Sequence, residues 1–231
     1  MMKAIFVTGT GTGVGKTVVG GALCSYLSLK KGLKVGVMKP VETGWDPKNS
    51  DAMTLKVLSG SEDPIEEIVP YRFDLPVAPL VAARSEKKDI DLGVLDEVYK
   101  KLLSRHDLVI VESAGGILVP IKEGFFFLDL VKRWNVPVLV VSENRLGTIN
   151  HTLLTCHYLI LKNVPVLGVI LNNKEEELDI SAQSNASVLE EFLPVPFLGS
   201  FPYLGKVKIW DLREKLAEFF ESSIRHKLLP L

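Results

Sequence analysis

A glycine-rich stretch near the N-terminus, residues 7–17 (VTGTGTGVGKT), constrains the fold of this chain more than any other feature. It follows a short apolar run, residues 4–7, and leads into a segment whose apolar residues recur at helical spacing. A strand, a glycine-rich loop ending in Gly-Lys-Thr and a helix are typical of a phosphate-binding P-loop. In such a loop, backbone N–H groups and a helix N-terminus surround an anion. Lys16 can reach the outer phosphates and the Thr17 hydroxyl can bind Mg²⁺, so we expect a nucleoside triphosphate site.

One position departs from the strict P-loop pattern. The residue five before Gly15 is Thr10, and the glycine expected there lies one place earlier, at Gly9. The alternative interpretation is a glycine-rich turn that carries Lys-Thr by chance. The strand before the loop and the helix after it favour the P-loop.

Strand-length apolar runs alternate with helical periodicity along the rest of the chain. Strands are predicted at residues 4–7, 34–38, 107–111, 136–141, 166–171 and 195–198. Helices are predicted at residues 18–27, 51–58, 92–102, 127–134, 149–161, 181–192 and 212–220, with an irregular loop at 60–80. This alternation predicts one α/β domain over residues 1–231, with a mostly parallel central sheet between two layers of helices, the three-layer fold of P-loop NTPases.

Composition excludes several classes of protein. The net charge of -1 gives no general attraction to nucleic acid or to anionic membranes. No apolar run approaches the roughly 20 residues that a membrane-spanning helix needs, and Gly9 interrupts the only N-terminal apolar run that a signal peptide could use. Cys24 and Cys156 lie in helical patterns and lack disulfide or metal-type spacing. We expect a cytoplasmic protein that binds neither nucleic acid nor membrane.

Polar residues follow the predicted strands, at the sheet edge where ligands of such folds bind. Glu112 ends a strand beside the loop, where a carboxylate can hold Mg²⁺ together with phosphate oxygens. Gly115 and Gly116 behind it would let backbone approach a ligand closely. Asp51 is either a second metal ligand or a helix cap. Lys39 is either catalytic or a solvated strand-end charge.

Several blocks of sequence resemble the dethiobiotin synthetase family, in the family's order and at similar spacings. They are residues 9–17, 39–44 (KPVETG), 49–52 (NSDA), 112–116 (ESAGG) and 146–151 (LGTINH), joined by Asn172 and residues 199–204. Together they span nearly the whole chain. The P-loop alone would indicate only a nucleotide-binding superfamily, so the other blocks make the resemblance specific.

The resemblance implies an ATP-dependent cyclo-ligase of biotin biosynthesis. Such an enzyme uses ATP, Mg²⁺ and CO₂ to close 7,8-diaminononanoate into dethiobiotin, a cyclic urea. One amine takes up CO₂ as a carbamate, whose oxygen attacks the γ-phosphate to give a carbamic-phosphoric anhydride. The second amine then attacks the carbonyl and phosphate leaves. The resemblance also implies a homodimer in which the substrate carboxylate binds near the interface.

The family's site residues carry over to matching positions of this chain. The implied catalytic residues are Lys39, Lys16 and Thr12. The implied metal ligands are Thr17, Asp51 and Glu112. The implied nucleotide contacts are Gly13, Val14, Gly15, Lys16, Thr17, Val18, Asp51, Glu112, Ser113, Ala114, Gly115, Asn172, Asn173, Pro202, Tyr203 and Leu204. The implied substrate contacts are Thr12, Lys39, Thr43, Gly147, Thr148 and Asn150.

Two of these positions differ from the family pattern. Thr43 stands where serine is common, and Ser113 where glycine is usual.

Three other classes of protein are alternatives. A partition or septum-placement ATPase is the nearest of them, but it carries a lysine where this chain has Gly11, and the tail at residues 223–231 is short and weakly basic. An amidating synthetase of the cobyrinic acid type would need a further glutaminase domain. A non-catalytic nucleotide-binding module would not need Lys39, Asp51 and Glu112 together.

Overall fold

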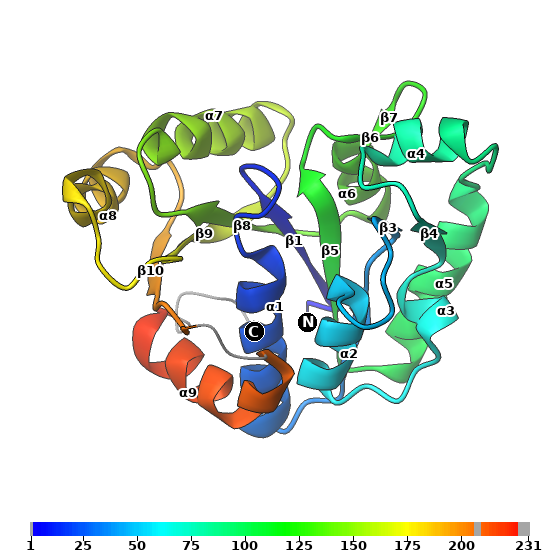
Figure 1. Cartoon of the computed structure of the whole chain (residues 1–231), viewed down its shortest axis with the longest axis horizontal. Helices are drawn as coiled ribbons and strands as arrows, with labels where there is room; N and C mark the ends of the chain where they lie inside the picture. The colour runs from blue at the N-terminus through cyan, green and yellow to red at the C-terminus, as the bar shows by residue number, and fades with distance from the viewer. Residues whose placement is uncertain (1, 206–208, 226–231) are drawn as a thin grey trace.

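A six-stranded parallel sheet forms the centre of the computed structural model, which describes residues 2–205 and 209–225. The order across the sheet is β10–β9–β8–β1–β5–β2 (Figure 1). These strands are β1 (Ala4–Gly9), β2 (Val35–Met38), β5 (Leu108–Gly116), β8 (Val138–Glu143), β9 (Val166–Asn172) and β10 (Phe197–Phe201). Each lies at a predicted position, and the predicted mostly parallel sheet is confirmed. Because β1 lies between β8 and β5, the loop that follows it emerges in the middle of the sheet edge.

Helices cover both faces of this sheet. On one face lie α1 (Lys16–Leu29), α2 (Asp51–Ser59) and α9 (Arg213–Ser223), and Figure 1 shows α1 flanked by the other two. On the opposite face lie α5 (Leu92–Arg105), α6 (Phe127–Trp134), α7 (Thr148–Leu161) and α8 (Ile180–Phe192). The three-layer architecture predicted from the alternation is therefore confirmed.

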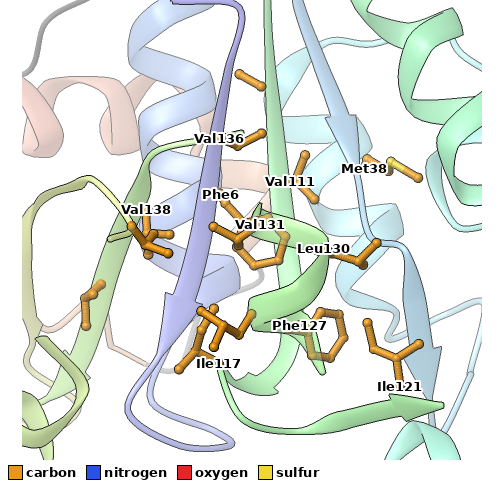
Figure 2. Close-up of a cluster of buried hydrophobic side chains, with 14 of the residues drawn as sticks. Phe6, Met38, Val111, Ile117, Ile121, Phe127, Leu130, Val131, Val136 and Val138 are labelled. Atoms are coloured by element: carbon orange, nitrogen blue, oxygen red, sulfur yellow. The ribbon is translucent and has the colours of Figure 1, made fainter. Parts of the chain in front are cut away.

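The side-chain alternation of the strands divides the core between the two faces. On β1, Ile5 and Val7 pack with the α1 layer, whereas Phe6 packs with the α6 layer. Figure 2 shows Phe6 beside Val131 of α6, and the centroid of its ring lies 6.3 Å from that of Phe127. On the other face, the rings of Tyr26 and Phe220 lie 5.3 Å apart and join α1 to α9. Apolar burial on both faces is the main force that holds the layers together.

The irregular loop predicted at residues 60–80 is wrong. This segment forms α3 (Ile65–Ile68), β4 (Tyr71–Phe73) and the start of α4 (Pro79–Ser85). Strand β4 pairs in parallel with β3 (Val41–Thr43), which lies about thirty positions earlier, so local periodicity did not reveal the pair. A second small sheet, the antiparallel pair β6 (Pro120–Lys122) and β7 (Phe125–Phe126), follows β5. A short 3₁₀ helix, η1 (Ile209–Leu212), precedes α9.

Strand β5 is longer than predicted. The strand predicted at 107–111 continues to Gly116, so Glu112 lies inside β5, paired with Val7, rather than after its end.

Among the helices of residues 2–205 and 209–225, none is both long enough and apolar enough to cross a bilayer. The last part of the weakly basic tail, residues 226–231, lies outside the described residues.

Candidate functional site

The glycine-rich loop connects β1 to α1 at the carboxyl edge of the sheet. Gly13 and Gly15 have φ angles of 74° and 94°, a left-handed backbone that favours glycine. A Cβ atom on Gly15 would lie 2.0 Å from Nδ2 of Asn172, so the loop approaches β9 closely. Lys16 is buried at the start of α1, and its Nζ donates to the Gly11 carbonyl at 3.1 Å. Burial lowers the pKa of the Lys16 ammonium, although Glu112 opposes this effect.

A cleft of about 570 Å³ opens beside this loop. Its walls come from the loop, from β3, from the start of α2, from the segment before α4 and from the end of β5. It brings together many of the predicted site residues, namely Thr12, Gly13, Gly15, Lys16, Thr17, Val18, Lys39, Thr43, Asp51, Ala114 and Gly115. Thr12 and Thr43 therefore line the same space as Lys39, as the resemblance implied.

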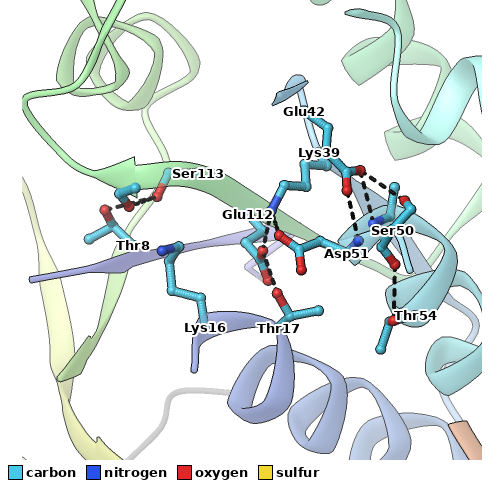
Figure 3. Close-up of polar contacts among 12 residues, drawn as sticks. Thr8, Lys16, Thr17, Lys39, Glu42, Ser50, Asp51, Thr54, Glu112 and Ser113 are labelled. Carbon is cyan, nitrogen blue, oxygen red and sulfur yellow. Dashed lines mark hydrogen bonds and ion pairs between the residues drawn. The ribbon is translucent and has the colours of Figure 1, made fainter. Parts of the chain in front are cut away.

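Lys39 and Asp51, which line this cleft, form a charged cluster with the buried Glu112 (Figure 3). The Lys39 ammonium lies 2.5 Å from Oδ2 of Asp51 and 2.6 Å from Oε1 of Glu112, and both Lys39 and Glu112 are buried. Burial alone would lower the pKa of Lys39, but the carboxylates of Glu112 and Asp51 outweigh it and raise that pKa. Lys39 is thus a fully charged, buried cation and not a solvated strand-end lysine.

The same cluster has the ligand chemistry of a magnesium site. The Thr17 hydroxyl donates to Oε1 of Glu112 at 2.9 Å, whereas Oε2 of Glu112 is buried and has no hydrogen-bond partner. In residues 2–205 and 209–225, no three His, Cys, Asp or Glu side chains cluster to hold a metal by themselves. Two carboxylates and a hydroxyl suit Mg²⁺, which commonly completes its shell with water and phosphate oxygens. The residues present therefore fit a metal that arrives with a nucleotide.

The N-terminus of α2 shows that Asp51 is not the cap of this helix, whereas its role as a metal ligand stays a prediction. The cap of this helix is Ser50, whose Oγ accepts from the Met53 N–H at 3.1 Å. The Asp51 side chain points to Lys39 instead of capping the helix, and its pKa is lowered because Lys39 outweighs the effect of burial. Glu42, which the sequence analysis did not single out, also reaches this helix start and accepts the Asp51 N–H at 2.7 Å. Glu42 lies inside the block 39–44, but only its contacts with the start of α2 show that it takes part in this site.

The residues predicted to contact the nucleoside lie on the other side of the loop. The Asn172 amide is buried and donates to the Val14 carbonyl at 3.1 Å, and its backbone is in register with Phe201 of β10. Pro202, Tyr203 and Leu204 directly follow that strand and are half-buried. The structure brings Asn172, Asn173 and residues 202–204 to one edge, but none of them lines the 570 Å³ cleft.

Further predicted residues, among them Val14 and Glu112, do not line the cleft either. Gly147, Thr148 and Asn150 lie at the start of α7, where the buried Thr148 hydroxyl lies 2.6 Å from that of Ser142. Ser113 is buried in β5, and its hydroxyl lies 3.1 Å from that of Thr8 and donates to the Gly115 carbonyl at 2.8 Å.

A P-loop at the carboxyl edge of a parallel sheet, with a carboxylate pair beside it, defines a P-loop nucleotide-binding protein. The model of the AAA domain family matches residues 3–209. The ATP-dependent dethiobiotin synthetase of Thermodesulfovibrio yellowstonii is 39% identical over 231 residues, covering 94% of each chain. That of Bacillus licheniformis is 40% identical and covers 96% of this chain and 95% of the relative. This chain belongs to the family of ATP-dependent dethiobiotin synthetases, so the predicted family and the predicted enzyme are both confirmed.

A solved structure of a different function shares the fold. The MinC:MinD cell division protein complex of Aquifex aeolicus aligns with a TM-score of 0.57 and 17% identity, covering 93% of this chain and 86% of that one. At this identity the likeness shows the α/β fold alone. The septum-placement alternative therefore gains nothing beyond a common architecture.

Proposed function

We propose that this protein closes 7,8-diaminononanoate into dethiobiotin with CO₂ and ATP, using the cleft beside the P-loop. Family membership supports the reaction. The observation that carries the site is the cluster of Lys39, Asp51 and Glu112, which places a buried cation and two metal-type carboxylates beside Lys16 and Thr17. A protein that only bound a nucleotide would not need a buried lysine in the part of the cleft that Thr12 and Thr43 line.

The charges of the cleft match the chemistry of the phosphoryl transfer. When the carbamate oxygen attacks the γ-phosphorus, two anions approach each other, so cations must offset the charge that develops. Lys16 is proposed to serve the β- and γ-phosphates, and Lys39 the carbamate and the transferring phosphoryl group. After ADP leaves, the second amine attacks the anhydride carbonyl, phosphate departs and the ring closes. Thr12 and Thr43 line the cleft where their hydroxyls can hydrogen-bond the diamine.

Magnesium is proposed to bind at Thr17, Asp51 and Glu112. The unpartnered Oε2 of Glu112 supports this assignment, because a buried acceptor without a donor needs a compensating partner. When bound, Mg²⁺ would draw charge from the phosphate oxygens. Lys39 offsets the charge of the two carboxylates, and Thr17 donates to Glu112.

The remaining contacts are proposed by position. The nucleoside is assigned to Asn172, Asn173, Pro202, Tyr203 and Leu204, with Val14, Val18 and the backbone at 113–115 nearby. The substrate carboxylate is assigned to Gly147, Thr148 and Asn150. Since these three residues do not line the cleft of their own chain, we propose a homodimer in which they serve a partner. The reaction is placed in the cytoplasm, where the free thiols Cys24 and Cys156 stay reduced.

The test is a coupled measurement on the purified protein. It is incubated with diaminononanoate, bicarbonate, Mg²⁺ and ATP, and both phosphate and dethiobiotin are followed. We expect the two products to appear in equal amounts. A Lys16→Met preparation controls for contaminating ATPases and should release neither product. Phosphate release without dethiobiotin would overturn the proposed reaction and leave only an ATPase.

A further inference from the structure

Glu42 is a buried acid that has no part in the reaction as described above. It lies in β3, three residues after Lys39, and only 5% of its surface is exposed. A buried carboxylate costs free energy unless it is hydrogen-bonded or paired. A third acid beside Asp51 and Glu112 also adds negative charge to a cluster that already holds two carboxylates. The free-energy cost of burying Glu42 must therefore be offset by its contacts.

Its hydrogen bonds all go to the start of α2. Oε1 accepts the Asp51 N–H at 2.7 Å, while Oε2 accepts the Ser50 hydroxyl at 3.0 Å and the Ala52 N–H at 3.2 Å (Figure 3). A carboxylate at a helix N-terminus is favoured by the unsatisfied N–H groups and by the helix dipole. Such charge-assisted bonds are stronger than bonds between neutral groups.

Helix capping alone does not account for this arrangement. Ser50 already caps α2 by accepting the Met53 N–H, so the helix has an ordinary cap without Glu42. The shortest bond of Glu42 instead holds the backbone of Asp51, the first residue of the helix. The side-chain carboxylate of the same residue lies 2.5 Å from Nζ of Lys39. Glu42 and Lys39 thus hold Asp51 from two sides, one by its backbone and the other by its side chain.

We propose that Glu42 is a positioning residue that fixes the backbone of Asp51, so that the Asp51 carboxylate faces Lys39 and the magnesium position. The proposal rests on the proposed function, since it gives Asp51 the role of a metal ligand. Groups that orient metal ligands commonly change metal affinity or activity by about 10- to 100-fold when mutated. Loss of Glu42 should therefore appear in the metal requirement of the enzyme.

The test compares Glu42→Gln with Ser50→Ala. Glutamine keeps the shape of Glu42 but replaces one acceptor oxygen with an NH₂ donor, which then faces donors of α2. Ser50→Ala removes the cap and one donor but leaves the bond between Glu42 and the Asp51 N–H. Three quantities are measured for each variant: the Mg²⁺ concentration for half-maximal turnover at saturating ATP and diamine, Mn²⁺ binding to the ADP complex by EPR, and the metal-free melting temperature.

In Glu42→Gln, we expect the half-saturating Mg²⁺ concentration and the Mn²⁺ dissociation constant to rise by about 10-fold or more, with turnover largely restored at high Mg²⁺. In Ser50→Ala, we expect a lower melting temperature and an almost unchanged metal requirement. Unchanged Mn²⁺ binding in Glu42→Gln, or an equal change in Ser50→Ala, would overturn the proposal. If Glu42→Gln does not fold, Glu42→Asp withdraws the charge by one methylene and is expected to change Mn²⁺ binding in the same direction. The Mn²⁺ readout needs no turnover, so failure of the proposed reaction would be seen separately, as absence of dethiobiotin from the wild-type protein.

Discussion

The buried ammonium of Lys39 lies between two carboxylates, that of the buried Glu112 and that of the half-exposed Asp51. Removing one partner of a buried ion pair commonly costs about 3–5 kcal/mol, because the other charge stays buried without compensation. Glu112 would be left in this state, with its Oε2 already unpartnered. A bound metal ion could replace the missing positive charge, so stability and metal binding are linked at this residue.

Lys39→Ala is predicted to lose turnover while still binding ATP. Loss of a positioned charge in the transition state commonly reduces kcat by about 10²–10³-fold or more, whereas the P-loop contacts stay intact. The variant should also unfold more easily without metal, and Mg²⁺ with ADP should raise its melting temperature more than that of the wild type. Calorimetric titration with an ATP analogue, steady-state kinetics and thermal melts check these points. Turnover close to the wild type would remove Lys39 from the catalytic residues.

Gly15→Ala is predicted to weaken nucleotide binding and stability together. The φ of 94° disfavours any residue with a Cβ, and that Cβ would meet Nδ2 of Asn172 at 2.0 Å. Backbone strain of this kind costs about 1–3 kcal/mol, and the loop must also move away from β9. The matched control is Gly32→Ala, which has a φ of 67° but no atom within 4 Å of the new Cβ. The control should lose some stability and bind ATP normally; equal ATP affinity in Gly15→Ala would contradict the close packing of the loop.

Asp63 connects two elements at the opposite edge of the sheet from the cleft. Between α2 and α3, its Oδ2 lies 2.6 Å from the Ser61 hydroxyl and 2.6 Å from Nε2 of His106, the C-cap residue that follows α5. Burial would raise the pKa of Asp63, but the hydrogen bonds from Ser61 and His106 outweigh it and lower that pKa. Gly36 on β2 leaves space for the imidazole, since a Cβ there would lie 2.6 Å from Cδ2 of His106.

The free energy of unfolding at acidic pH should therefore depend on Asp63. A carboxyl whose folded-state pKa lies below its unfolded value of about 3.9 stabilises the protein above that pH. This stabilisation is lost as the pH falls through the lower folded-state pKa. Asp63→Asn should be less stable than the wild type near neutral pH and lose less stability on acidification. Urea unfolding across the acid range measures this, with Ser61→Ala as an intermediate case; identical pH dependence in Asp63→Asn and wild type would contradict it.

At the scale of secondary-structure elements, the sequence predicts those strands and helices that have a local pattern of apolar residues. The six strands of the central sheet were found because their β-branched, apolar runs are buried on both faces. The pair β3–β4 was missed because its register, Val41 against Tyr71, joins segments that are far apart in the chain. Glu42 lies inside the block 39–44, but its bonds to residues 50–52 form only when α2 begins beside it, so the sequence pattern gave it no role.

At the scale of the whole molecule, strand order determines which residues meet. β5 and β8 flank β1, so Glu112 lies next to the P-loop although it is almost a hundred positions later in the chain. The motifs predicted that Lys39, Asp51 and Glu112 share a site. They did not predict that Lys39 bridges the two carboxylates, because that contact depends on side-chain directions that only the packed sheet edge determines.

The proposed homodimer gives a prediction for the α7 surface. Leu154 and Leu161 are seven positions apart, hence on one face of the helix, and are 62% and 72% exposed, while Leu146 just before the helix is 80% exposed. Apolar side chains gathered on an exposed face commonly mark an interface. A Leu154→Glu, Leu161→Glu variant should sediment as a monomer at concentrations where the wild type is a dimer.

The same variant should also need more diamine for half-maximal turnover, because Gly147, Thr148 and Asn150 would no longer reach a partner's cleft. Its ATP affinity should stay unchanged, since Lys16 and Thr17 act within one chain. Leu29→Glu, at the end of α1 on the opposite face of the sheet, introduces a comparable charge at a half-exposed leucine and should leave both the dimer and the diamine requirement intact. Analytical ultracentrifugation and substrate titrations on the three proteins decide the matter. A wild-type monomer with normal activity would remove the partner from the site, and the carboxylate would then have to bind within the 570 Å³ cleft itself.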